Sequence, residues 1–434
     1  MKLTGKDLYK FAASLYPITR SVSSPGNLET LKLIKKRINN LEIKSFNSGS
    51  KVYSWKIPYE WHIKEAYIAN SKGKKIIDFK KNNLHVLNYS QPINKKINYK
   101  KLLKHLYFIK SQPNAIPYVT SYYSKNWGFC LSYNQFKKLK KNSSYKVKID
   151  SKFIKGKMYY GEILIKGKGK KEILLSTNIC HPSMGNNETS GIVVTTALAK
   201  WINNLRNRKY SYRIIYIPET IGSIAYIQKN IKNLKKYIVA GFVVVCVGDN
   251  RNTSYLPSRE GNTLADRAAT YVLNKYNKGF KKYSFLDRGS DERQFCNFKV
   301  NLPVCSIMSS KYGEYKEYHT SLDNLKFISS KGLEKSFKLL KKILMVLETN
   351  KLPAMFKDNY RYPCEPKLSS YNLRNHLSIK ENYNHDKLIS NILLLSNGKR
   401  DIIEISDILK EDIFKISEIS FALEKAKLIK QVTK

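Results

Sequence analysis

From Lys171 onward, short apolar runs rich in β-branched residues alternate with segments of helical periodicity, and this alternation constrains the fold more than any other feature of the chain. Strands and helices that alternate in this way build an α/β sheet with parallel strands. The predicted elements are strand 172–177, helix 190–204, strand 212–217, helix 221–234, strand 239–247, helix 264–276, strand 302–308 and helix 331–347. We therefore expect an α/β fold with a doubly wound, mostly parallel sheet.

The remaining parts of the chain have a different texture. Residues 5–15 and 28–39 predict two helices, whereas 49–157 contains short strands rich in Tyr, Trp and Asn. After a linker at 353–366, the pattern predicts helices 387–395, 402–409 and 413–426 and a strand at 428–432, which is the order of a winged-helix module. The predicted domains are an α/β domain (1–48 and 158–352), an inserted β-rich subdomain (49–157), and a linker with a winged-helix-like domain (353–434).

The net charge of +46 on 434 residues suggests nucleic acid at first, because clustered Lys and Arg neutralise phosphates. Residues 365–434 hold 12 basic and 10 acidic side chains, so the excess is spread along the larger remainder. Abundant Lys, Asn, Ile and Tyr are also what an AT-rich coding sequence produces. We therefore do not expect a nucleic-acid partner, although the charge favours anionic substrates through long-range steering.

Two features bear on the location of the protein. No apolar run is long enough to cross a bilayer, and residues 1–10 lack the apolar stretch of a signal peptide. The six cysteines are scattered without C-x-x-C spacing, which predicts reduced thiols rather than disulfides or a zinc knuckle. We expect a cytoplasmic protein without a membrane partner.

Polar residues that could do chemistry follow the predicted strands, at the ends where open α/β sheets bind ligands. Two of the seven histidines occupy such ends, and acidic residues lie in the same loops. Imidazoles and carboxylates suit zinc, and a spare Glu could act as general base toward a metal-bound water. Each residue alone could be a core or capping residue, but five strand ends together predict an active site. The residues are His181, Glu188, Glu219, Asp249, Asp291, Glu292 and His319.

Two other chemistries fit the sequence less well. Ser-His-Asp catalysis often uses a G-x-S-x-G turn, which the chain lacks, and Ser190 falls at a helix start. Cys180 beside His181 suggests a thiol nucleophile, but adjacent side chains on an extended segment point in opposite directions. The chain has no G-x-G-x-x-G motif or phosphate loop, so we expect no nucleotide cofactor.

Several segments together resemble a known family. They are 15–22 (LYPITRSV), 116–123 (IPYVTSYY), 126–130 (NWGFC), 179–183 (ICHPS), 186–191 (NNETSG), 218–223 (PETIGS), 246–249 (CVGD), 289–294 (GSDERQ) and 317–321 (EYHTS). The chain is similar to the zinc-aminopeptidase-like family of bacterial polysaccharide-biosynthesis loci, which combines an aminopeptidase-type α/β domain, an inserted β-rich subdomain and a C-terminal winged helix. More distantly, it resembles the two-zinc aminopeptidases and glutaminyl cyclases.

The resemblance implies metal ligands and a base. The implied ligands are His181, Glu188, Asp249 and His319, and the implied general base is Glu219.

Three departures from the aminopeptidase pattern reduce the ligand set. Asn178-Ile-Cys stands where that pattern has His-x-Asp, Asn186-Asn-Glu stands where it has an Asp pair, and Glu219-Thr stands where it has a Glu pair. We therefore expect one zinc ion rather than two, and we leave open whether Glu188 or Asn187 faces it. A metal-free relic is the alternative.

Substrate contacts are less specified by the sequence. Arg293 could clamp a carboxylate, and Asp291 and Glu292 could hold a free amine; alternatively, the three could brace their own loop by ion pairing. Tyr122, Tyr123 and Trp127 could form an aromatic wall over the site or the core of the insert, and we favour the core.

These interpretations lead to one function and one alternative. We expect a zinc-dependent aminopeptidase-like hydrolase that cleaves an amide bond of a small peptide or, as the resemblance implies, of an amino-sugar or glycan precursor. The alternative is a catalytically inactive aminopeptidase-like binding or assembly module in surface-polysaccharide biosynthesis. Because its charge is nearly balanced, we interpret the winged-helix-like part as a packing or dimerisation element, and we expect a homo-oligomer.

Overall fold

A sheet of eight strands lies at the centre of the structure, in the order β1-β10-β12-β11-β13-β16-β14-β15. The computed structural model describes residues 4–356, 365–374 and 380–432. The middle strands are parallel: β12 (Ser211–Ile217), β11 (Glu172–Asn178), β13 (Ile238–Val243) and β16 (Val304–Met308). On one side β10 (Lys157–Ile165) and β1 (Glu42–Asn47) continue the sheet in antiparallel pairing, and on the other side β14 (Ser254–Leu256) pairs antiparallel with β16 and parallel with β15 (Lys281–Lys282).

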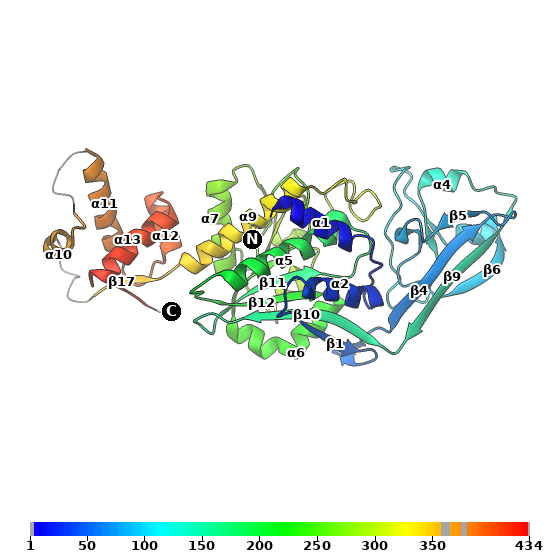
Figure 1. Cartoon of the computed structure of the whole chain (residues 1–434), viewed down its shortest axis with the longest axis horizontal. Helices are drawn as coiled ribbons and strands as arrows, with labels where there is room; N and C mark the ends of the chain where they lie inside the picture. The colour runs from blue at the N-terminus through cyan, green and yellow to red at the C-terminus, as the bar shows by residue number, and fades with distance from the viewer. Residues whose placement is uncertain (1–3, 357–364, 375–379, 433–434) are drawn as a thin grey trace. The chain divides into compact units, whose positions relative to one another are not determined.

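Helices cover both faces of this sheet (Figure 1). On one face α5 (Ser190–Asn204) packs against β11 and β12, α1 (Gly5–Leu15) packs against α5, and α2 (Pro25–Lys35) packs against β10. On the other face α6 (Ile221–Tyr237) packs against β13 and against α8 (Glu292–Phe295). Because both faces are covered, every residue of β11 is buried, which explains its continuous apolar character. The predicted α/β fold is confirmed.

The strand order creates a point where the chain reverses direction across the sheet. β11 lies between β12, which follows it in the chain, and β13, which follows β12. In open α/β sheets, ligands bind at such a switch point, beyond the carboxyl ends of the strands. The loops after β11, β12, β13 and β16 therefore meet where a site is expected.

Two elements have bounds that differ from those predicted, for local physical reasons. The strand predicted over 239–247 stops at Val243, and the following residues form a buried loop in which Cys246 has a φ of 54°. An apolar run there signals burial rather than strand. The helix predicted over 28–39 begins at Pro25 after the N-cap position Ser24, because proline is favoured in the first helical turn.

The inserted segment forms its own antiparallel sheet, in the order β5-β4-β9-β6. Its strands are β4 (Glu60–Ala69), β5 (Lys75–Asp78), β6 (Ile93–Asn98) and β9 (Ser144–Ile154), and short helices α3 (Tyr99–Leu103) and α4 (Tyr133–Lys137) accompany them. Trp61, Phe129 and Val147 belong to its buried core. Two minor pairs, β2 (Lys51–Val52) with β3 (Trp55–Lys56) and β7 (Leu106–Tyr107) with β8 (Phe129–Cys130), complete it.

The chain divides into two compact units. Unit 1 comprises Met1–Asp266 and Gly279–Leu340, and unit 2 comprises Arg267–Lys278 and Lys341–Lys434. Helices α7 (Leu264–Tyr276) and α9 (Ser330–Thr349) run from one unit into the other. The insert and the central sheet thus fall into one unit, while the three-domain boundaries expected from the sequence stay a prediction. Among the described helices, none combines the length and the apolar character that a membrane span requires.

Unit 2 contains a small helical assembly closed by two strands. Its helices are α10 (Glu365–Ser370), α11 (Lys380–Leu395), α12 (Ile402–Leu409) and α13 (Ile413–Lys425), and β17 (Pro353–Met355) pairs antiparallel with β18 (Ile429–Gln431). The first residues of the predicted linker are therefore a strand, and 357–364 lie outside the described residues. Helices α11, α12 and α13 and strand β18 follow in the expected order, although α11 begins at Lys380 rather than at 387 and α10 was not expected. The winged-helix assignment stays a prediction.

Candidate functional site

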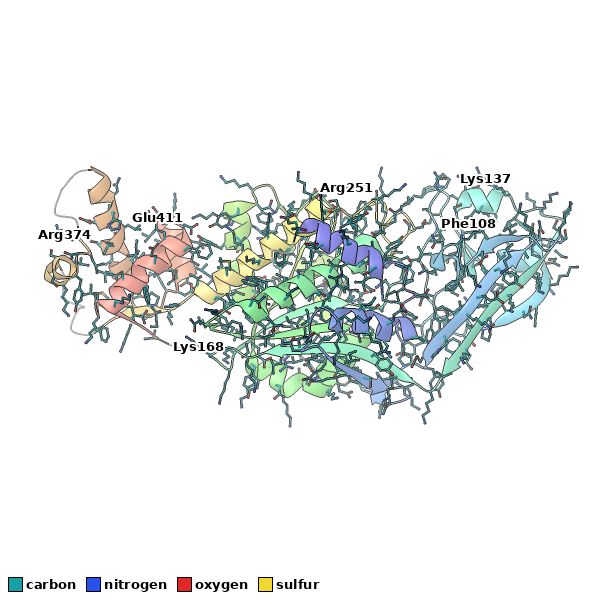
Figure 2. The ribbon with its side chains drawn as sticks, in the orientation of Figure 1. Phe108, Lys137, Lys168, Arg251, Arg374 and Glu411 are labelled. Atoms are coloured by element: carbon teal, nitrogen blue, oxygen red, sulfur yellow. The ribbon has the colours of Figure 1, made fainter. Side chains whose placement is uncertain are left out.

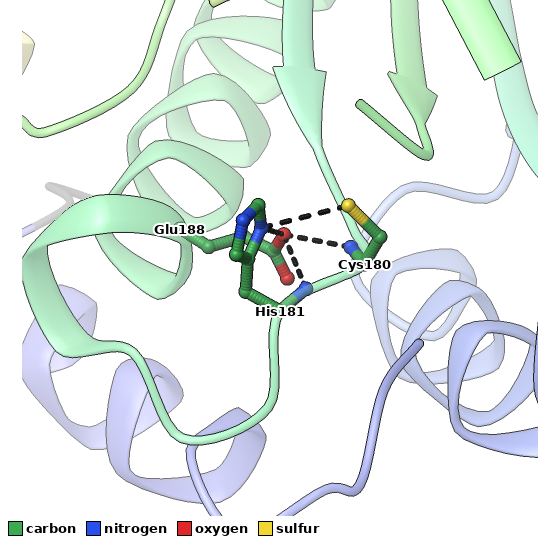
Figure 3. A group of neighbouring side chains, drawn as sticks. All are labelled: Cys180, His181 and Glu188. Carbon is green, nitrogen blue, oxygen red and sulfur yellow. Dashed lines mark hydrogen bonds and ion pairs between the residues drawn. The ribbon is translucent and has the colours of Figure 1, made fainter. Parts of the chain in front are cut away.

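The segment after β11 turns sharply and places a cysteine, a histidine and a glutamate against one another (Figure 3). Glu188 comes from a single π-helical turn, Gly185–Thr189, which leads into α5. Its Oε2 accepts hydrogen bonds from the backbone N–H groups of Cys180 and His181 and lies 2.7 Å from His181 Nδ1. Such π-helical turns occur frequently at functional sites.

Arg20, from the segment between α1 and α2, holds the other side of this glutamate. Its Nε donates to Glu188 Oε1 and to the His181 carbonyl, each at 2.9 Å, and its Nη1 donates to the Leu15 carbonyl at 2.8 Å. Arg20 and Glu188 both have 0% exposed side chains. Arg20 therefore ties the N-terminal segment to the loop that carries His181.

The charges around His181 favour a cation at this position. Burial by itself lowers the pKa of His181, but Cys180 and the Glu188 carboxylate raise that pKa well above its ordinary value. Burial raises the pKa of Glu188, whereas His181 and Arg20 hold it below its ordinary value. The loop after β11 thus favours negative charge at Glu188 and positive charge beside the histidine ring, which a metal ion at Nε2 would supply in place of a proton.

Cys180 contacts His181 despite the expectation that adjacent side chains would diverge. Its Sγ lies 3.5 Å from His181 Nδ1, although the two residues are neighbours in the chain. Burial nevertheless raises the pKa of Cys180 to about 12, so the thiol stays protonated at neutral pH. The geometric reason given against a thiol nucleophile was wrong, but the burial of the sulfur argues in the same direction.

His319 reaches the same place from the loop after β16. Its ring centroid is 5.4 Å from that of His181, and the Tyr118 ring packs against both, at 5.3 Å and 5.2 Å. The Nε2 atom of His319 is buried and has no hydrogen-bond partner within the described chain. Burial and the neighbouring His181 lower the pKa of His319 to about 3, so its ring is neutral. A buried, unpartnered ring nitrogen is a free donor for a metal.

Glu219 stands on a strained turn after β12. Thr220 has φ 62° and ψ −72°, and the Ile221 N–H bonds the Glu219 carbonyl at 2.7 Å, which makes this a rare γ-turn. Ser290 donates to Glu219 Oε1 at 2.6 Å, while Glu219 Oε2 lies 3.7 Å from His181 Nε2. The Glu219 side chain is 21% exposed. Strain of this kind, together with the positive φ of His319, is concentrated where function requires unusual geometry.

The structure places Asp249 in a hydrogen-bond network of its own. Its two oxygens accept from the Ser310 N–H and hydroxyl, the Arg251 N–H and the Asn186 amide, at 2.9–3.0 Å. Asn186 and Asn187 donate their backbone N–H groups to Asp323. The backbone of Asn187 thus bonds Asp323. Binding of a metal by Glu188 or Asp249 stays a prediction.

The three charged residues after α7 have separate roles in the fold. The fully buried Glu292 accepts from the Gly289 and Ser290 N–H groups and from the Tyr312 hydroxyl, so it braces its loop. Asp291 accepts from the Thr220 N–H, and burial and then Glu219 raise its pKa to about 8.

Arg293 is exposed and donates to Thr220 Oγ1 at 2.7 Å, which places its guanidinium beside the Glu219 turn. Of the three charged residues, Arg293 is thus the one available to a substrate. Binding of substrate by Asp291, Glu292 and Arg293 stays a prediction.

The aromatic residues of the insert divide between core and site. Tyr122 and Trp127 pack against the core of the insert, as favoured from the sequence, but the Tyr122 hydroxyl also lies 3.1 Å from that of Tyr118. Tyr123 is 61% exposed and donates to the Lys56 carbonyl. Tyr118 contacts both histidines, although the sequence marked it only as part of a conspicuous segment.

The donors present fit a zinc ion. A histidine that binds a metal through one ring nitrogen usually bonds a carboxylate through the other. In His181, Nδ1 bonds Glu188, so Nε2 is the nitrogen that faces a metal. His319 Nε2 is unpartnered and buried, and Glu219 Oε2 lies near His181 Nε2. Cys180, His181 and Glu188 also form a cluster of potential ligand atoms within 4.8 Å of one another, but they bond mainly among themselves. Among the described residues of this site, the free ligand atoms are therefore Nε2 of His181 and Nε2 of His319, and Glu219 places a carboxylate oxygen beside them.

Comparison with known proteins adds relatives along the whole chain. A family model described as "Domain of unknown function (DUF4910)" matches residues 9–350. A Clostridium acetobutylicum protein, named as a candidate polysaccharide biosynthesis protein with an aminopeptidase-like domain, is 39% identical over 430 residues, covering 99% of this chain and 97% of that protein.

Solved structures share the fold. The crystal structure of a candidate peptidase from Clostridium acetobutylicum has a TM-score of 0.89 and 37% identity, covering 99% of this chain and 96% of that one. The zinc aminopeptidase BSAP from Bacillus subtilis has a TM-score of 0.58 and 13% identity, covering 79% of this chain and 95% of that one. At that identity, the likeness to BSAP concerns the fold.

Proposed function

Since the chain belongs to the DUF4910 domain family and has the fold of the zinc aminopeptidases, we propose that it is a zinc-dependent hydrolase of amide bonds with one metal ion. Its substrate is a small peptide or the amide of an amino-sugar or glycan precursor. The name of the Clostridium acetobutylicum relative, which refers to polysaccharide biosynthesis, supports the glycan branch of this proposal.

The arrangement of the two histidines carries the proposal. His181 keeps its Nε2 available because Glu188 occupies its Nδ1, and His319 has a buried Nε2 without a partner. Leaving a buried polar nitrogen unpartnered costs free energy, so a metal ion that binds both nitrogens would offset that cost. Glu219 supplies the nearby carboxylate.

Each side chain then has a definite task. His181 and His319 would hold a zinc ion, which would supply Lewis acidity toward the amide carbonyl and toward the attacking water. Glu219 accepts a proton from the attacking water at its free Oε2, while Ser290 holds its other carboxylate oxygen by a hydrogen bond. Arg293, exposed beside Thr220, binds a carboxylate of the substrate.

Metal analysis tests this proposal directly. Protein purified without chelator should contain about one equivalent of zinc. His181→Ala and His319→Ala should each lose it, whereas the control His62→Ala, which changes a histidine of the insert paired with Glu60, should keep it. Glu219→Gln should retain zinc but lose hydrolysis of aminopeptidase and deacylase substrates.

A second candidate function follows from the carboxylates. Glu188 and Asp249 already accept full sets of hydrogen bonds, and asparagines stand at 178 and 187. These features favour a metal-free binding or assembly module that keeps the fold. Absence of zinc in the wild-type protein, with unchanged stability in both histidine variants, would support this module and refute the hydrolase.

A further inference from the structure

The insert contains a long segment without any acidic residue. Residues 79–149 include 15 lysines but no Asp, Glu or Arg. The whole chain has 33 acidic residues among 434, so a biased base composition that enriches lysine everywhere does not by itself explain a gap of this length. The charge of this segment is therefore a local feature.

The fold gathers many of these lysines at one end of the insert. Helix α3 follows β6 and contacts both β6 and β9, and the Tyr145 hydroxyl donates to the Lys140 carbonyl at 3.0 Å, which ties the start of β9 to the loop before it. We define the lysine face by six exposed residues: Lys96, Lys100, Lys101, Lys140, Lys141 and Lys146. Figure 1 shows β6 at the outer edge of this sheet, and Lys137, labelled in Figure 2, marks the nearby end of α4.

Like charges oppose one another within this face. Lys96 and Lys146 are direct cross-strand partners in the β6–β9 pair, an arrangement that destabilises an antiparallel sheet. Elsewhere on the same sheet, Lys148 has an ion pair with Glu65 at 2.6 Å. Among the described residues, none of the six lysines of the face forms an ion pair. A polyanion bound across them would relieve this repulsion.

The chemistry of the face selects among polyanions. Nucleic-acid surfaces often use arginine and exposed aromatic rings, but this segment lacks arginine, and Phe108 and Phe136 stack on each other at 4.1 Å in a partly buried layer. The exposed ring of the segment, Tyr123, donates to the carbonyl of Lys56 in β3, which is not part of the lysine face. Membrane-binding surfaces expose apolar side chains among their cations, whereas the large apolar side chain exposed on α3 is Leu103 alone, at 41%. Lysine ammonium groups are flexible point charges, so they can contact anionic groups spread along a flexible polymer without the bidentate geometry that arginine favours.

We propose that the lysine face binds an acidic polysaccharide chain through its carboxylate or other anionic groups. The face lies on β6, α3, the loop before β9 and the start of β9, whereas the insert reaches the histidines through Tyr118 and Tyr122. It therefore holds a polymer at a place separate from the histidines. This binding does not depend on zinc or on hydrolysis.

Binding to polygalacturonate tests the proposal with the full-length protein. The face variant carries Lys96→Gln, Lys100→Gln, Lys101→Gln and Lys146→Gln. The control variant also loses four lysine charges, at exposed residues of the β10–β11 loop and α6. It carries Lys166→Gln, Lys168→Gln, Lys232→Gln and Lys235→Gln, and Lys168 is labelled in Figure 2. Melting curves of the three proteins should coincide, because all eight lysines are exposed.

The wild type and the control should bind polygalacturonate with an affinity that falls as salt rises. A lysine at an anionic surface contributes about fivefold in affinity, so the face variant should bind at least about tenfold more weakly and with a shallower salt dependence. Equal losses in both variants, or no binding of polygalacturonate by the wild type, would overturn the proposal. Tighter wild-type binding to duplex DNA or to phosphatidylglycerol vesicles at equal charge concentration would assign the face to those partners instead.

Discussion

Arg20→Met is the substitution that best tests how the site is held together. Methionine keeps an unbranched side chain in the buried space but removes the guanidinium. The change leaves Glu188 Oε1 and the carbonyls of His181 and Leu15 without the donor that they share. It therefore isolates the link between the N-terminal segment and the loop after β11.

The expected loss can be worked from the contacts. Removing one partner of a buried ion pair costs about 3–5 kcal/mol, because the other charge stays buried without compensation. Glu188 Oε2 keeps its three contacts at 2.7 Å, so the carboxylate is not left bare and we expect the lower end, about 3 kcal/mol. Because Glu188 orients His181, zinc affinity should fall by about 10-fold to 100-fold.

Urea unfolding followed by tryptophan fluorescence measures the free energy of unfolding of unit 1, which contains Arg20. All four tryptophans, Trp55, Trp61, Trp127 and Trp201, belong to unit 1. Arg37→Met is the matched control, because the exposed Arg37 lies over the Phe11 ring at 4.0 Å and near Asp7, and its loss should cost about 1 kcal/mol or less.

The reasoning also makes a prediction about coupling. Arg20→Met combined with Glu188→Gln should lose less stability than the two single changes added together, since the double variant no longer buries an unpaired charge. If Arg20→Met unfolds within about 1 kcal/mol of the wild type and binds zinc equally well, Arg20 does not position the site.

Three further predictions concern strain, reactivity and pH. Thr220→Gly should raise the free energy of unfolding by about 1 kcal/mol, because glycine adopts the φ of 62° without strain; a loss in denaturant titration would refute a strained turn. The pKa of about 12 at Cys180 predicts that iodoacetamide at pH 8 labels it at least about a hundredfold more slowly in the folded than in the urea-unfolded protein, and equal rates by mass spectrometry would contradict its burial. Burial raises the pKa of Glu162, but its contacts with Lys44, Tyr226 and other partners outweigh burial and hold that pKa below its ordinary value. Glu162 therefore contributes stability at neutral pH that is lost as the pH falls through the lowered pKa. Glu162→Gln should therefore cost most at pH 7 and least below about pH 4 in urea titrations, and a constant cost would refute the linkage.

The elements that sequence predicted best are those with local signals. Helix α1 occupies 5–15 as expected because Thr4 and Asp7 form a capping box at its start. Strand β11 was visible because burial on both faces makes its residues uniformly apolar or small. In both cases the information lies within a few residues of the element itself.

The sequence did not predict which acidic residues have a free carboxylate and which are held by hydrogen bonds. Glu188 bonds Arg20, 168 positions away, and the carboxylates of Asp249 and Asp323 depend on backbone N–H groups of distant loops. The motif around Arg20 was conspicuous, but nothing local assigns it a partner. Whether a carboxylate is free or satisfied is decided by tertiary contacts.

That distinction supports the proposal of one metal ion rather than two. Asp249 accepts four hydrogen bonds and Glu188 accepts from Arg20, two backbone N–H groups and His181. Charge-assisted hydrogen bonds contribute about 1.5–3 kcal/mol each, so withdrawing either carboxylate to bind a second ion would cost several of these bonds. The Nε2 atoms of His181 and His319 require no such exchange, and Glu219 Oε2 stays free to act as the base. The hydrogen bonds already made by Glu188 and Asp249 thus support the same conclusion as the asparagines at 178 and 187, and they do so from the folded structure rather than from a motif.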